Sequence, residues 1–301
     1  MQGILVVNKP RGMTSHDVVA KVRRIFGTRQ VGHTGTLDPD AEGVLPILIG
    51  RATKLSDILT ADEKEYIARV KLGIVTDTYD ISGTVLKQND VCVTEDDIKN
   101  TALQFLGLQK QVPPMYSAIK IDGKKLYQLA RAGIEIERPT REIEIKEISC
   151  FDFDMKNSVF SLKVSCSKGT YIRSLCYDIG ERLGTGAVMA ELIRTKSGRF
   201  KLDKARTLEE IEEKVLSGEG EKLLVSLDEA LSDYPLKEVS DENAIKLRNG
   251  LRLRTNQLDL DANVGDVFRM YEDGKLLCLV SVILDNTNTK VVKLEKTFFN
   301  C

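Results

Sequence analysis

The sequence predicts an α+β fold in which a mixed, largely antiparallel sheet packs against helices. One reason is alternation of apolar and polar residues, which is typical of half-buried strands and is clear over residues 64–74. Another is apolar residues at helical spacing behind a Thr or Ser cap, as in residues 14–26. A third is the Lys-Asn-Ser turn at 156–158 between two β runs, 141–153 and 159–167. Strands joined by so short a turn must be antiparallel neighbours.

The first half of the chain begins with a strand over residues 3–10 that ends at Pro10. After the helix of residues 14–26, the apolar residues 44–50 form either a buried strand or the passage from a loop into a strand. A helix over residues 94–107 opens with Thr94 and has Asp three residues later, which resembles a capping box.

The second half continues with a helix over residues 170–184 that Gly184 terminates. An acidic helix follows at 207–216, and another capped helix at 240–250. Residues 267–284 contain two β runs around an Asp-Gly pair, which favours a tight hairpin turn.

The length of 301 residues exceeds one ordinary domain and predicts two. We expect a main domain over residues 1–232 and a small β-barrel-like module over 235–301. The boundary falls near residues 232–240, where the acidic helix and its loop give way to the last capped helix.

Composition is that of an ordinary globular protein, with 42% hydrophobic and 30% charged residues. No apolar run approaches the roughly 20 residues needed to span a bilayer, so we expect no membrane contact. Six cysteines without CxxC spacing and two histidines in all argue against a Cys/His zinc site. The cysteines, at 92, 150, 166, 176, 278 and 301, suggest reduced thiols in a cytoplasm. We expect a cytoplasmic protein without a bound metal.

Charge is unevenly distributed although the net charge is −1. Residues 163–206 carry ten Lys or Arg against four acids, a local balance of +6. Residues 207–242 carry twelve acids against three lysines, a balance of −9. The asymmetry is typical of an anion-binding face, but solvated helix faces also carry charge, and charge alone leaves both readings open.

Several catalytic classes lack their motifs. The chain has no GxxxxGK[ST] phosphate loop, no GxSxG elbow and no kinase motif set, and two histidines leave little room for a Ser-His-Asp arrangement. What remains is a polar, glycine-spaced loop around Asp38 in "QVGHTGTLDPDAEGVLPILIG", residues 30–50. An Asp-Pro pair there fits a surface turn, and it also fits a reactive carboxylate on a rigid loop.

The chain closely resembles the TruB family of bacterial tRNA pseudouridine-55 synthases. The resemblance spans roughly residues 3–200 and is carried, in the family's order, by "NKPRGMTSHDVV", "GHTGTLDPDAEGVLPILIGRATK", "KEYIARVKLGIVTDTYDISG", "PPMYSAIKIDGKKLYQLARAG", "CSKGTYIRSLCYDIGERLG" and "LIRTKSG". The C-terminal module looks like the PUA-type RNA-binding module of these enzymes. One departure is Val188, where the family more often has histidine.

The resemblance implies that the protein isomerises uridine 55 to pseudouridine in the TΨC loop of tRNA, without a cofactor. It implies that Asp38 is the catalytic aspartate, that Arg173 pairs with it, and that Tyr66 stacks on the flipped base. Carboxylates suit glycosyl chemistry because they stabilise or attack an electron-poor sugar centre. Whether Asp38 attacks C1′, attacks the ring, or removes the 2′-proton to give a glycal stays open.

The resemblance also implies a set of substrate-binding residues. Lys9 and Pro10 support the active-site loop, His33 contacts the substrate arm, and Tyr171 and Leu192 line the pocket; Lys120, Lys124 and Lys125 belong to an insertion, residues 110–146, that folds over the T arm. We expect this insertion and the basic segment 163–206 to form one RNA-binding face.

Two other functions compete with this hypothesis. An RNA-binding module or chaperone would grip the T arm without modifying it, and a nucleosidase or glycosidase would use Asp38 to release free base. The intact set of Asp38, Tyr66 and Arg173 weighs against the first. The second usually requires a further carboxylate or a metal, which the motifs do not supply. For the oligomeric state we expect a monomer.

Overall fold

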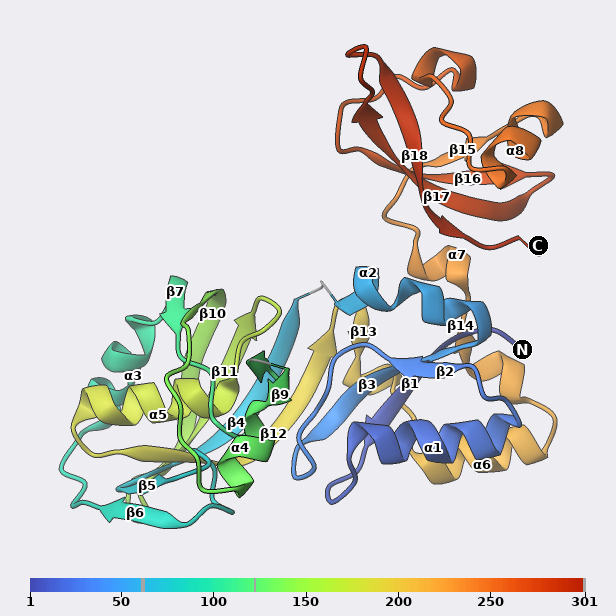
Figure 1. Cartoon of the computed structure of the whole chain (residues 1–301). Coiled ribbons are helices and arrows are strands. Elements are labelled where there is room, and N and C mark those ends of the chain that lie inside the picture. Colours follow the sequence, from blue (N-terminus) through green and yellow to red (C-terminus); the bar gives the residue numbers. More distant parts are fainter. Residues whose placement is uncertain (61–62, 122, 300–301) are drawn as a thin grey trace.

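The computed structural model describes residues 1–60, 63–121 and 123–299, so that Cys301 lies outside the described residues. Ten described strands form one large sheet in the order β14-β1-β3-β12-β4-β11-β10-β7, with β2 added on β3 and β13 on β12 (Figure 1). They are β1 (Gly3–Lys9), β2 (Val31–His33), β3 (Glu42–Ile49), β4 (Lys64–Leu72), β7 (Gly107–Gln111), β10 (Arg141–Asp154), β11 (Val159–Cys166), β12 (Ala187–Ser197), β13 (Phe200–Lys201) and β14 (Leu224–Val225).

Helices cover this sheet, and smaller sheets lie outside it. The helical segments are α1 (Ser15–Phe26), η1 (Gly50–Leu55), α2 (Ser56–Thr60), α3 (Glu95–Leu103), α4 (Leu126–Arg131), α5 (Ile172–Leu183), η2 (Leu202–Lys204), α6 (Leu208–Leu216), η3 (Gly220–Leu223), α7 (Leu227–Ala230), α8 (Asp241–Arg248) and η4 (Thr255–Leu258). The remaining strands are β5 (Ile74–Thr76), β6 (Val85–Gln88), β8 (Lys120–Ile121), β9 (Lys124–Lys125), β15 (Leu236–Glu238), β16 (Val267–Glu272), β17 (Lys275–Leu284) and β18 (Lys290–Thr297).

The large sheet is mixed and mostly antiparallel, which confirms the predicted fold class. Within the described residues its ladders are antiparallel, apart from the pairing of β3 with β12. That parallel pairing consists of Ile193 opposite Glu42 and Arg194 opposite Gly43. It joins the N-terminal half of the sheet to the half that carries the insertion.

Both faces of the N-terminal half of the sheet are buried. Along β1, Leu5 and Val7 belong to the main hydrophobic cluster, whereas Ile4 and Val6 belong to a second cluster on the opposite face. This explains the unbroken apolar run that begins the chain, since a strand covered on both sides needs no polar face. Helices α1 and α6 pack together over one half of the sheet, and α3 and α5 over the other (Figure 1).

The local signals for helix ends are confirmed. Thr14 caps α1 and Thr94 caps α3, each with a reciprocal bond to the Asp three residues on. Gly184 ends α5 in the left-handed conformation, with φ of 74°. These ends were predictable because each depends on residues within one helical turn.

A separate four-stranded sheet, in the order β15-β16-β17-β18, forms the C-terminal module and confirms its predicted β character. The module lies against η1 and α2 (Figure 1). Lys54 Nζ donates to the carbonyl of Thr297 at 2.9 Å, and Lys296 pairs with Asp57 at 2.8 Å. Along the described chain no helix is long and apolar enough to cross a membrane.

Apolar packing also joins the module to the large sheet, and this packing is testable. Leu279 on β17 is 0% exposed and shares a cluster with Ile4 and Leu48, whereas Leu284 on the same strand is 46% exposed. We expect Leu279→Ala to lower the free energy of unfolding by about 2–5 kcal/mol, because it leaves a cavity between the two parts. Leu284→Ala, the matched control, should change it by less than about 1 kcal/mol. Urea denaturation of both variants measures the difference, and equal losses would show that the contact contributes little.

Candidate active site

Asp38 lies in the loop between β2 and β3, and buried neighbours fix this loop. Leu37 and Ala41 are both in the main hydrophobic cluster. Ser15 Oγ donates to the Leu37 carbonyl at 3.1 Å and accepts from its amide at 2.9 Å, and the amide of Ala41 donates to the Asp38 carbonyl at 3.1 Å. The side chain of Asp38 is nevertheless 42% exposed. The loop therefore holds a carboxylate at the surface on a rigid backbone.

Lys9 fastens the same loop from below. Its side chain is fully buried, and Nζ donates to the carbonyls of Pro10 at 2.9 Å, Met13 at 2.6 Å and Pro39 at 2.9 Å. The bond to Pro39 reaches the residue directly after Asp38. Pro10 is exposed and contributes its carbonyl to this arrangement. Because Lys9 is buried and bonded to these carbonyls, it holds the loop from inside the fold and does not itself reach the surface.

Arg173, near the start of α5, is the cation that meets Asp38. Its Nε lies 2.8 Å from Asp38 Oδ2, and its side chain is only 5% exposed. Nη1 donates to the Thr78 carbonyl at 3.1 Å, and Nη2 donates to the Tyr116 carbonyl at 2.9 Å. Asp80 Oδ2 lies 3.7 Å from Nη1. Two carboxylates and two carbonyls thus hold the guanidinium, which in turn fixes the orientation of the Asp38 side chain.

Arg194 forms a second buried cation beneath the loop. It is 1% exposed, and it donates through Nε to the Val44 carbonyl at 2.7 Å and through Nη2 to the Gly35 carbonyl at 3.2 Å. Gly43, at φ of 100°, sits against its backbone, where an added Cβ would lie 2.3 Å from the Arg194 carbonyl oxygen. A side chain at position 43 is therefore excluded, and the glycine is required for the approach of β3 to β12.

Tyr66 lies on β4 between Arg194 of β12 and Val164 of β11. Burial raises the pKa of its phenol; the Arg194 guanidinium opposes this shift, and the Asp38 carboxylate adds to it. Burial likewise raises the pKa of Tyr171, and Asp38 again contributes in the same direction. Both phenols are therefore neutral donors at neutral pH, within electrostatic reach of Asp38.

Comparison with known proteins decides the family. Residues 23–172 match the family described as TruB family pseudouridylate synthase (N terminal domain), and residues 173–234 match tRNA pseudouridylate synthase B C-terminal domain. A tRNA pseudouridine synthase B of Bacillus cytotoxicus is 46% identical over 274 residues, which cover 89% of each chain. That of Geobacillus thermodenitrificans is 48% identical over 260 residues, covering 84% of this chain and 86% of the relative.

The chain belongs to the TruB family of pseudouridylate synthases. It is therefore an enzyme, an isomerase by reaction class. Among solved structures, a chain of a Cbf5-Nop10-Gar1 complex superposes with a TM-score of 0.76 at 28% identity, over 99% of this chain and 85% of that one. A chain of an H/ACA RNP bound to a substrate RNA containing 2′-deoxyuridine gives 0.74 at 26% identity, with the same coverage of both chains.

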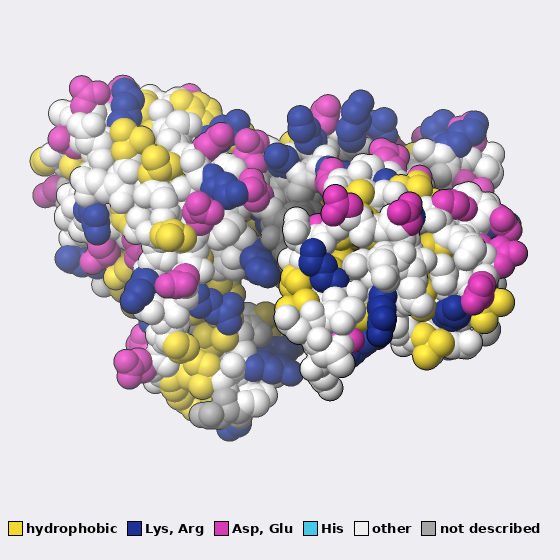
Figure 2. All heavy atoms as spheres, turned by 90° about the horizontal axis from the view of Figure 1, so that it is seen from above, with side chains coloured by type: hydrophobic (Ala, Val, Ile, Leu, Met, Phe, Trp, Pro, Cys, Tyr) yellow, Lys and Arg dark blue, Asp and Glu magenta, His cyan; other side chains and the backbone are white. Residues whose placement is uncertain are grey.

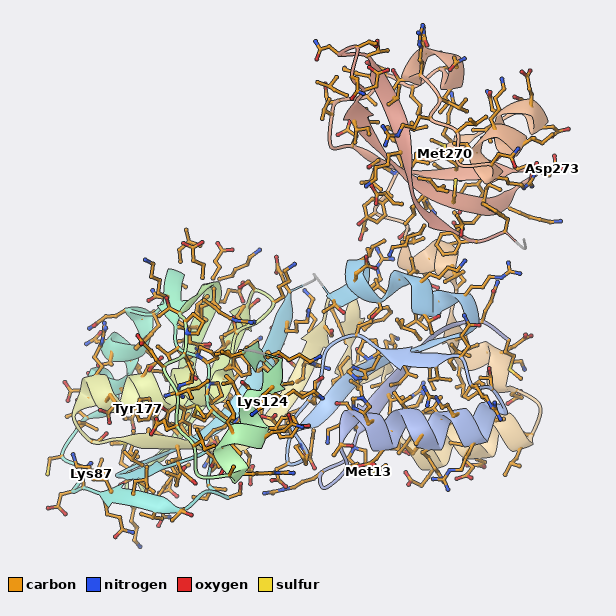
Figure 3. The ribbon with its side chains drawn as sticks, viewed as in Figure 1. Met13, Lys87, Lys124, Tyr177, Met270 and Asp273 are labelled. Carbon is orange, nitrogen blue, oxygen red and sulfur yellow. The ribbon has the colours of Figure 1, made fainter. Side chains whose placement is uncertain are left out.

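The TruB-type insertion leaves the sheet after β7 and returns at β10. Lys120 and Lys124 are exposed and Lys125 is partly exposed, and no ion pair between described residues occupies any of them. Figure 3 labels Lys124 on the insertion, near the middle of the molecule. Seen from above, two lobes enclose a hollow with Lys and Arg side chains on both sides (Figure 2). Within the described residues, none of these three lysines forms an ion pair with Asp38, whose ion-pair partner is Arg173.

The basic segment 163–206 is a weaker surface feature than its charge count predicts. Arg173 and Arg194 are buried within the site, and Arg199 pairs with Asp233 at 2.6 Å. The expectation that this whole segment contributes to an RNA-binding face is therefore wrong for its two buried arginines. A count of Lys and Arg in the sequence does not distinguish buried from exposed side chains, so it overestimates the surface charge of this segment.

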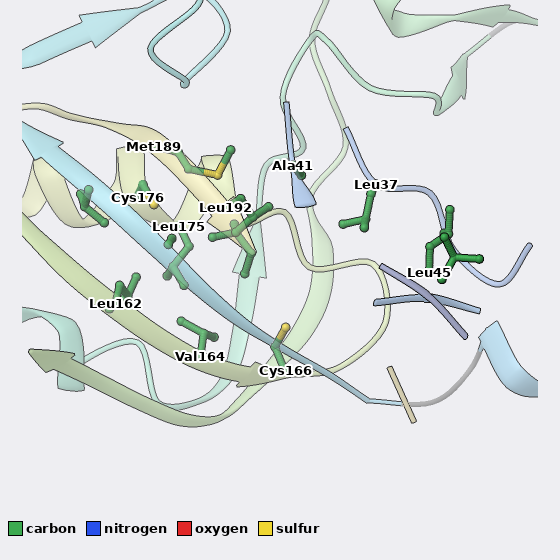
Figure 4. Packing of buried hydrophobic residues seen from close by; sticks show 14 of the residues in the cluster. Leu37, Ala41, Leu45, Leu162, Val164, Cys166, Leu175, Cys176, Met189 and Leu192 are labelled. Atoms are coloured by element: carbon green, nitrogen blue, oxygen red, sulfur yellow. The ribbon is translucent and has the colours of Figure 1, made fainter. Parts of the chain in front are cut away.

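Leu192 lies on β12 opposite Ala68 and belongs to the main cluster. Figure 4 shows it at the side of the cluster nearest Ala41 and Leu37, which flank Asp38. Leu192 therefore shares a hydrophobic cluster with the two apolar residues on either side of Asp38 in the loop. Val188, the departure from the family pattern, is fully buried earlier on the same strand, so that the change concerns core packing.

His33 ends β2, and its ring lies edge-on to that of His16, with centroids 5.6 Å apart. Its Nδ1 is buried and finds no hydrogen-bond partner among the described residues. Burial, followed by His16 and Arg194, lowers the pKa of His33, which keeps the ring neutral at neutral pH. His33 thus lies within electrostatic reach of Arg194.

Asp80 and Arg194 are site residues that sequence reasoning missed. Asp80 accepts through Oδ1 from the Ser82 amide at 3.1 Å and from Thr78 Oγ1 at 2.8 Å, in a turn next to Arg173. The dense polar string "TDTYDISG" was the available signal, because Asp, Ser and Gly in such a run are typical of a turn. For Arg194 the signal was an arginine two residues after Leu192, on the same face of its strand.

The buried ammonium of Lys9 makes a prediction about pH. Burial lowers its pKa from 10.5 to about 8, although Asp40, Glu42 and Asp38 oppose the shift. Between these values the unfolded chain holds more protons, so the contribution of Lys9 to the free energy of unfolding increases with pH over this window. The free energy of unfolding of the wild type should therefore increase relative to that of Lys9→Met between pH 8 and 10.5.

Urea denaturation across that pH range measures this difference. Lys87→Met, at an exposed position on β6, serves as the control and should follow the wild type throughout. Parallel curves for the wild type and Lys9→Met would show that Lys9 titrates at the same pH in the folded and unfolded chains.

Proposed function

We propose that this enzyme converts uridine 55 of tRNA to pseudouridine in the TΨC loop, with Asp38 as the catalytic residue. The observation that carries the proposal is the ion pair of 2.8 Å between a buried Arg173 and a half-exposed Asp38. An oriented carboxylate that reaches solvent is available to a substrate, whereas its arginine partner is not. The tRNA pseudouridine synthase B relatives, at 46% and 48% identity, support the same reaction.

The reaction breaks the C1′–N1 bond of uridine, turns the uracil, and forms a C1′–C5 bond. The proton on C5 is lost and N1 gains one, so atoms and electrons balance within the nucleotide. Asp38 serves this chemistry by stabilising or attacking the sugar or base as the glycosidic bond breaks. The routes through C1′ attack, ring attack and a glycal all use this one carboxylate.

Arg173 and the loop anchors supply orientation. A carboxylate held by a guanidinium on one side and by rigid backbone on the other approaches the nucleotide in one geometry. We assign Arg173 to this role, together with Lys9 and Pro10 beneath the loop. No oxidation or group transfer from outside is involved, and on this ground we propose that the reaction needs no cofactor.

Tyr66, Tyr171 and Leu192 form the environment of the base. We propose that Tyr66 stacks on the uracil and that its phenol assists removal of the C5 proton, the oxygen accepting this proton as its own proton leaves. Leu192 and Tyr171 close the pocket, which must retain the detached base while it turns. The pKa of Tyr66, raised by burial, keeps the phenol protonated before the reaction.

The target base is stacked within its arm, so it must be extruded into the pocket at a cost of a few kcal/mol. We propose that the T arm is recognised by shape, with His33 against the arm and Lys120, Lys124 and Lys125 on its phosphates. The C-terminal module, residues 235–301, is proposed as a PUA-type RNA-binding domain beside the domain of residues 1–232. A monomer in the cytoplasm remains our prediction.

Release of tritium from tRNA that carries [5-³H]uridine tests the reaction. We expect release by the wild type and none by Asp38→Asn, with tRNA affinity within about two-fold, because the amide keeps the shape of the side chain but cannot act as a carboxylate. Asp40→Asn is the matched control on the same loop, since Asp40 is exposed and its ion-pair partner within the described residues is Arg11, at 3.9 Å. It should release tritium at the wild-type rate.

The other outcomes separate the competing functions. Tight tRNA binding by the wild type without tritium release would favour an RNA chaperone. Formation of free uracil would favour a nucleosidase. Turnover by Asp38→Asn at the wild-type rate would overturn the assignment of Asp38.

The insertion makes a separate prediction about salt. If Lys124 contacts a phosphate, Lys124→Ala should weaken tRNA binding and reduce the slope of log K against log salt by about one. Lys87→Ala, at an exposed lysine on the β6 hairpin, is the control and should leave the slope unchanged (Figure 3). Filter binding between about 50 and 200 mM salt measures both slopes. Equal slopes for Lys124→Ala and the wild type would remove the insertion from the binding face.

A further inference from the structure

Gln111 is the last residue of β7, where the insertion leaves the sheet. It lies opposite Arg141, the first residue of β10, where the insertion returns. The side chain of Gln111 is buried although it carries a polar amide. A buried amide is costly unless its donor and acceptor are both satisfied, so its partners are informative.

Both partners belong to the backbone of Tyr171. Gln111 Nε2 donates to the Tyr171 carbonyl at 3.1 Å, and the Tyr171 amide donates to Gln111 Oε1 at 2.8 Å. Tyr171 is the N-cap of α5, and its own side chain makes no capping bond. A side chain from 60 residues earlier in the chain therefore holds the start of the helix that carries Arg173.

Two further bonds join the same segments. Ser174 Oγ donates to the Val112 carbonyl at 3.0 Å, and Arg173 Nη2 donates to the Tyr116 carbonyl at 2.9 Å. The base of the insertion is thus fastened to the first turn of α5 on either side of Arg173. In Figure 1 the insertion, drawn in green, crosses in front of the sheet from this joint.

We propose that Gln111 is a positioning residue for Arg173. It fixes the backbone of Tyr171, so the first turn of α5 presents the guanidinium to Asp38 at hydrogen-bond distance. It also links the insertion to the Asp38–Arg173 pair. An RNA arm that binds under the insertion therefore meets an ion pair whose geometry is already fixed. This inference rests on the proposed function of Asp38 and Arg173.

The proposal requires that Gln111 act through its hydrogen bonds and not through the volume of its side chain. A substitution that keeps the volume but removes the hydrogen bonds separates these two effects. Gln111→Met keeps the length and bulk of the side chain but removes both bonds to Tyr171. The substitution leaves the Tyr171 amide without this partner in a partly buried place, which frees the start of α5. A displacement of about 1 Å at a catalytic group lowers rates by about 100-fold, so a partial displacement should lower the rate by about ten-fold or more.

The experiment is single-turnover tritium release by Gln111→Met, with tRNA affinity measured alongside. We expect the loss in rate with affinity within about two-fold, because the RNA contacts are unchanged. Gln109→Met is the matched control, since Gln109 lies two residues earlier on β7 and donates only weakly, to the Leu106 carbonyl at 3.5 Å. It should react at the wild-type rate.

A crystal structure of Gln111→Met adds a readout that packing alone would not change. We expect Arg173 Nε to lie beyond hydrogen-bond distance of Asp38. A variant that reacts at the wild-type rate, or that is slow with this ion pair intact, would overturn the proposal. Should Gln111→Met fail to fold, Ser174→Ala removes the neighbouring bond to Val112 and should show a smaller loss of rate at unchanged affinity; no loss there would likewise overturn it.

Failure of this proposal is distinguishable from failure of the proposed function. The wild type and Asp38→Asn test the reaction itself, and they are measured first. If the wild type releases tritium and Asp38→Asn does not, a normal rate in Gln111→Met concerns Gln111 alone.

Discussion

The site depends on one buried guanidinium. Arg173 is almost entirely removed from water, and such a charge is tolerated in a fold only when its partners surround it. Those partners come from the Asp38 loop, from the turn at Thr78 and Asp80, and from Tyr116 in the insertion. Three segments that are distant in sequence must therefore be in place before the charge is satisfied. The contacts that stabilise the buried charge of Arg173 also fix the position of the Asp38 carboxyl group.

The parts of the fold that sequence predicts are those with local causes. The capping boxes at Thr14 and Thr94, the glycine stop at Gly184 and the hairpin between β10 and β11 each depend on neighbouring residues, and all are present. The pairing of β3 with β12 was not predictable in this way. It joins residues about 150 positions apart, and no local pattern records which buried strands will meet.

The site residues likewise fall into those that sequence motifs predict and those that they do not. Asp38, Tyr66 and Arg173 were assigned through the family motifs, and the structure brings them into one region. Gln111 carried no local signal, since a glutamine in a polar strand is unremarkable by composition, and for Arg194 the cue was its spacing from Leu192 on one strand face. Their roles arise from backbone groups of Val44, Gly35 and Tyr171, which are supplied by distant parts of the chain.

The contact between Gly43 and Arg194 has a consequence for the history of the protein. In most enzymes two separate requirements limit sequence change, one for folding in the core and one for activity at the surface. Where β3 pairs with β12 the two requirements coincide. Gly43, which lets β3 approach β12, lies five residues from Asp38, and its neighbour Arg194 supports the same loop. A mutation at this position is therefore expected to disturb the fold and the site together, and not to give a folded but inactive protein. Drift in the lineage is therefore expected to accumulate elsewhere, in the module edges and the exposed hairpins, while this crossing stays unchanged.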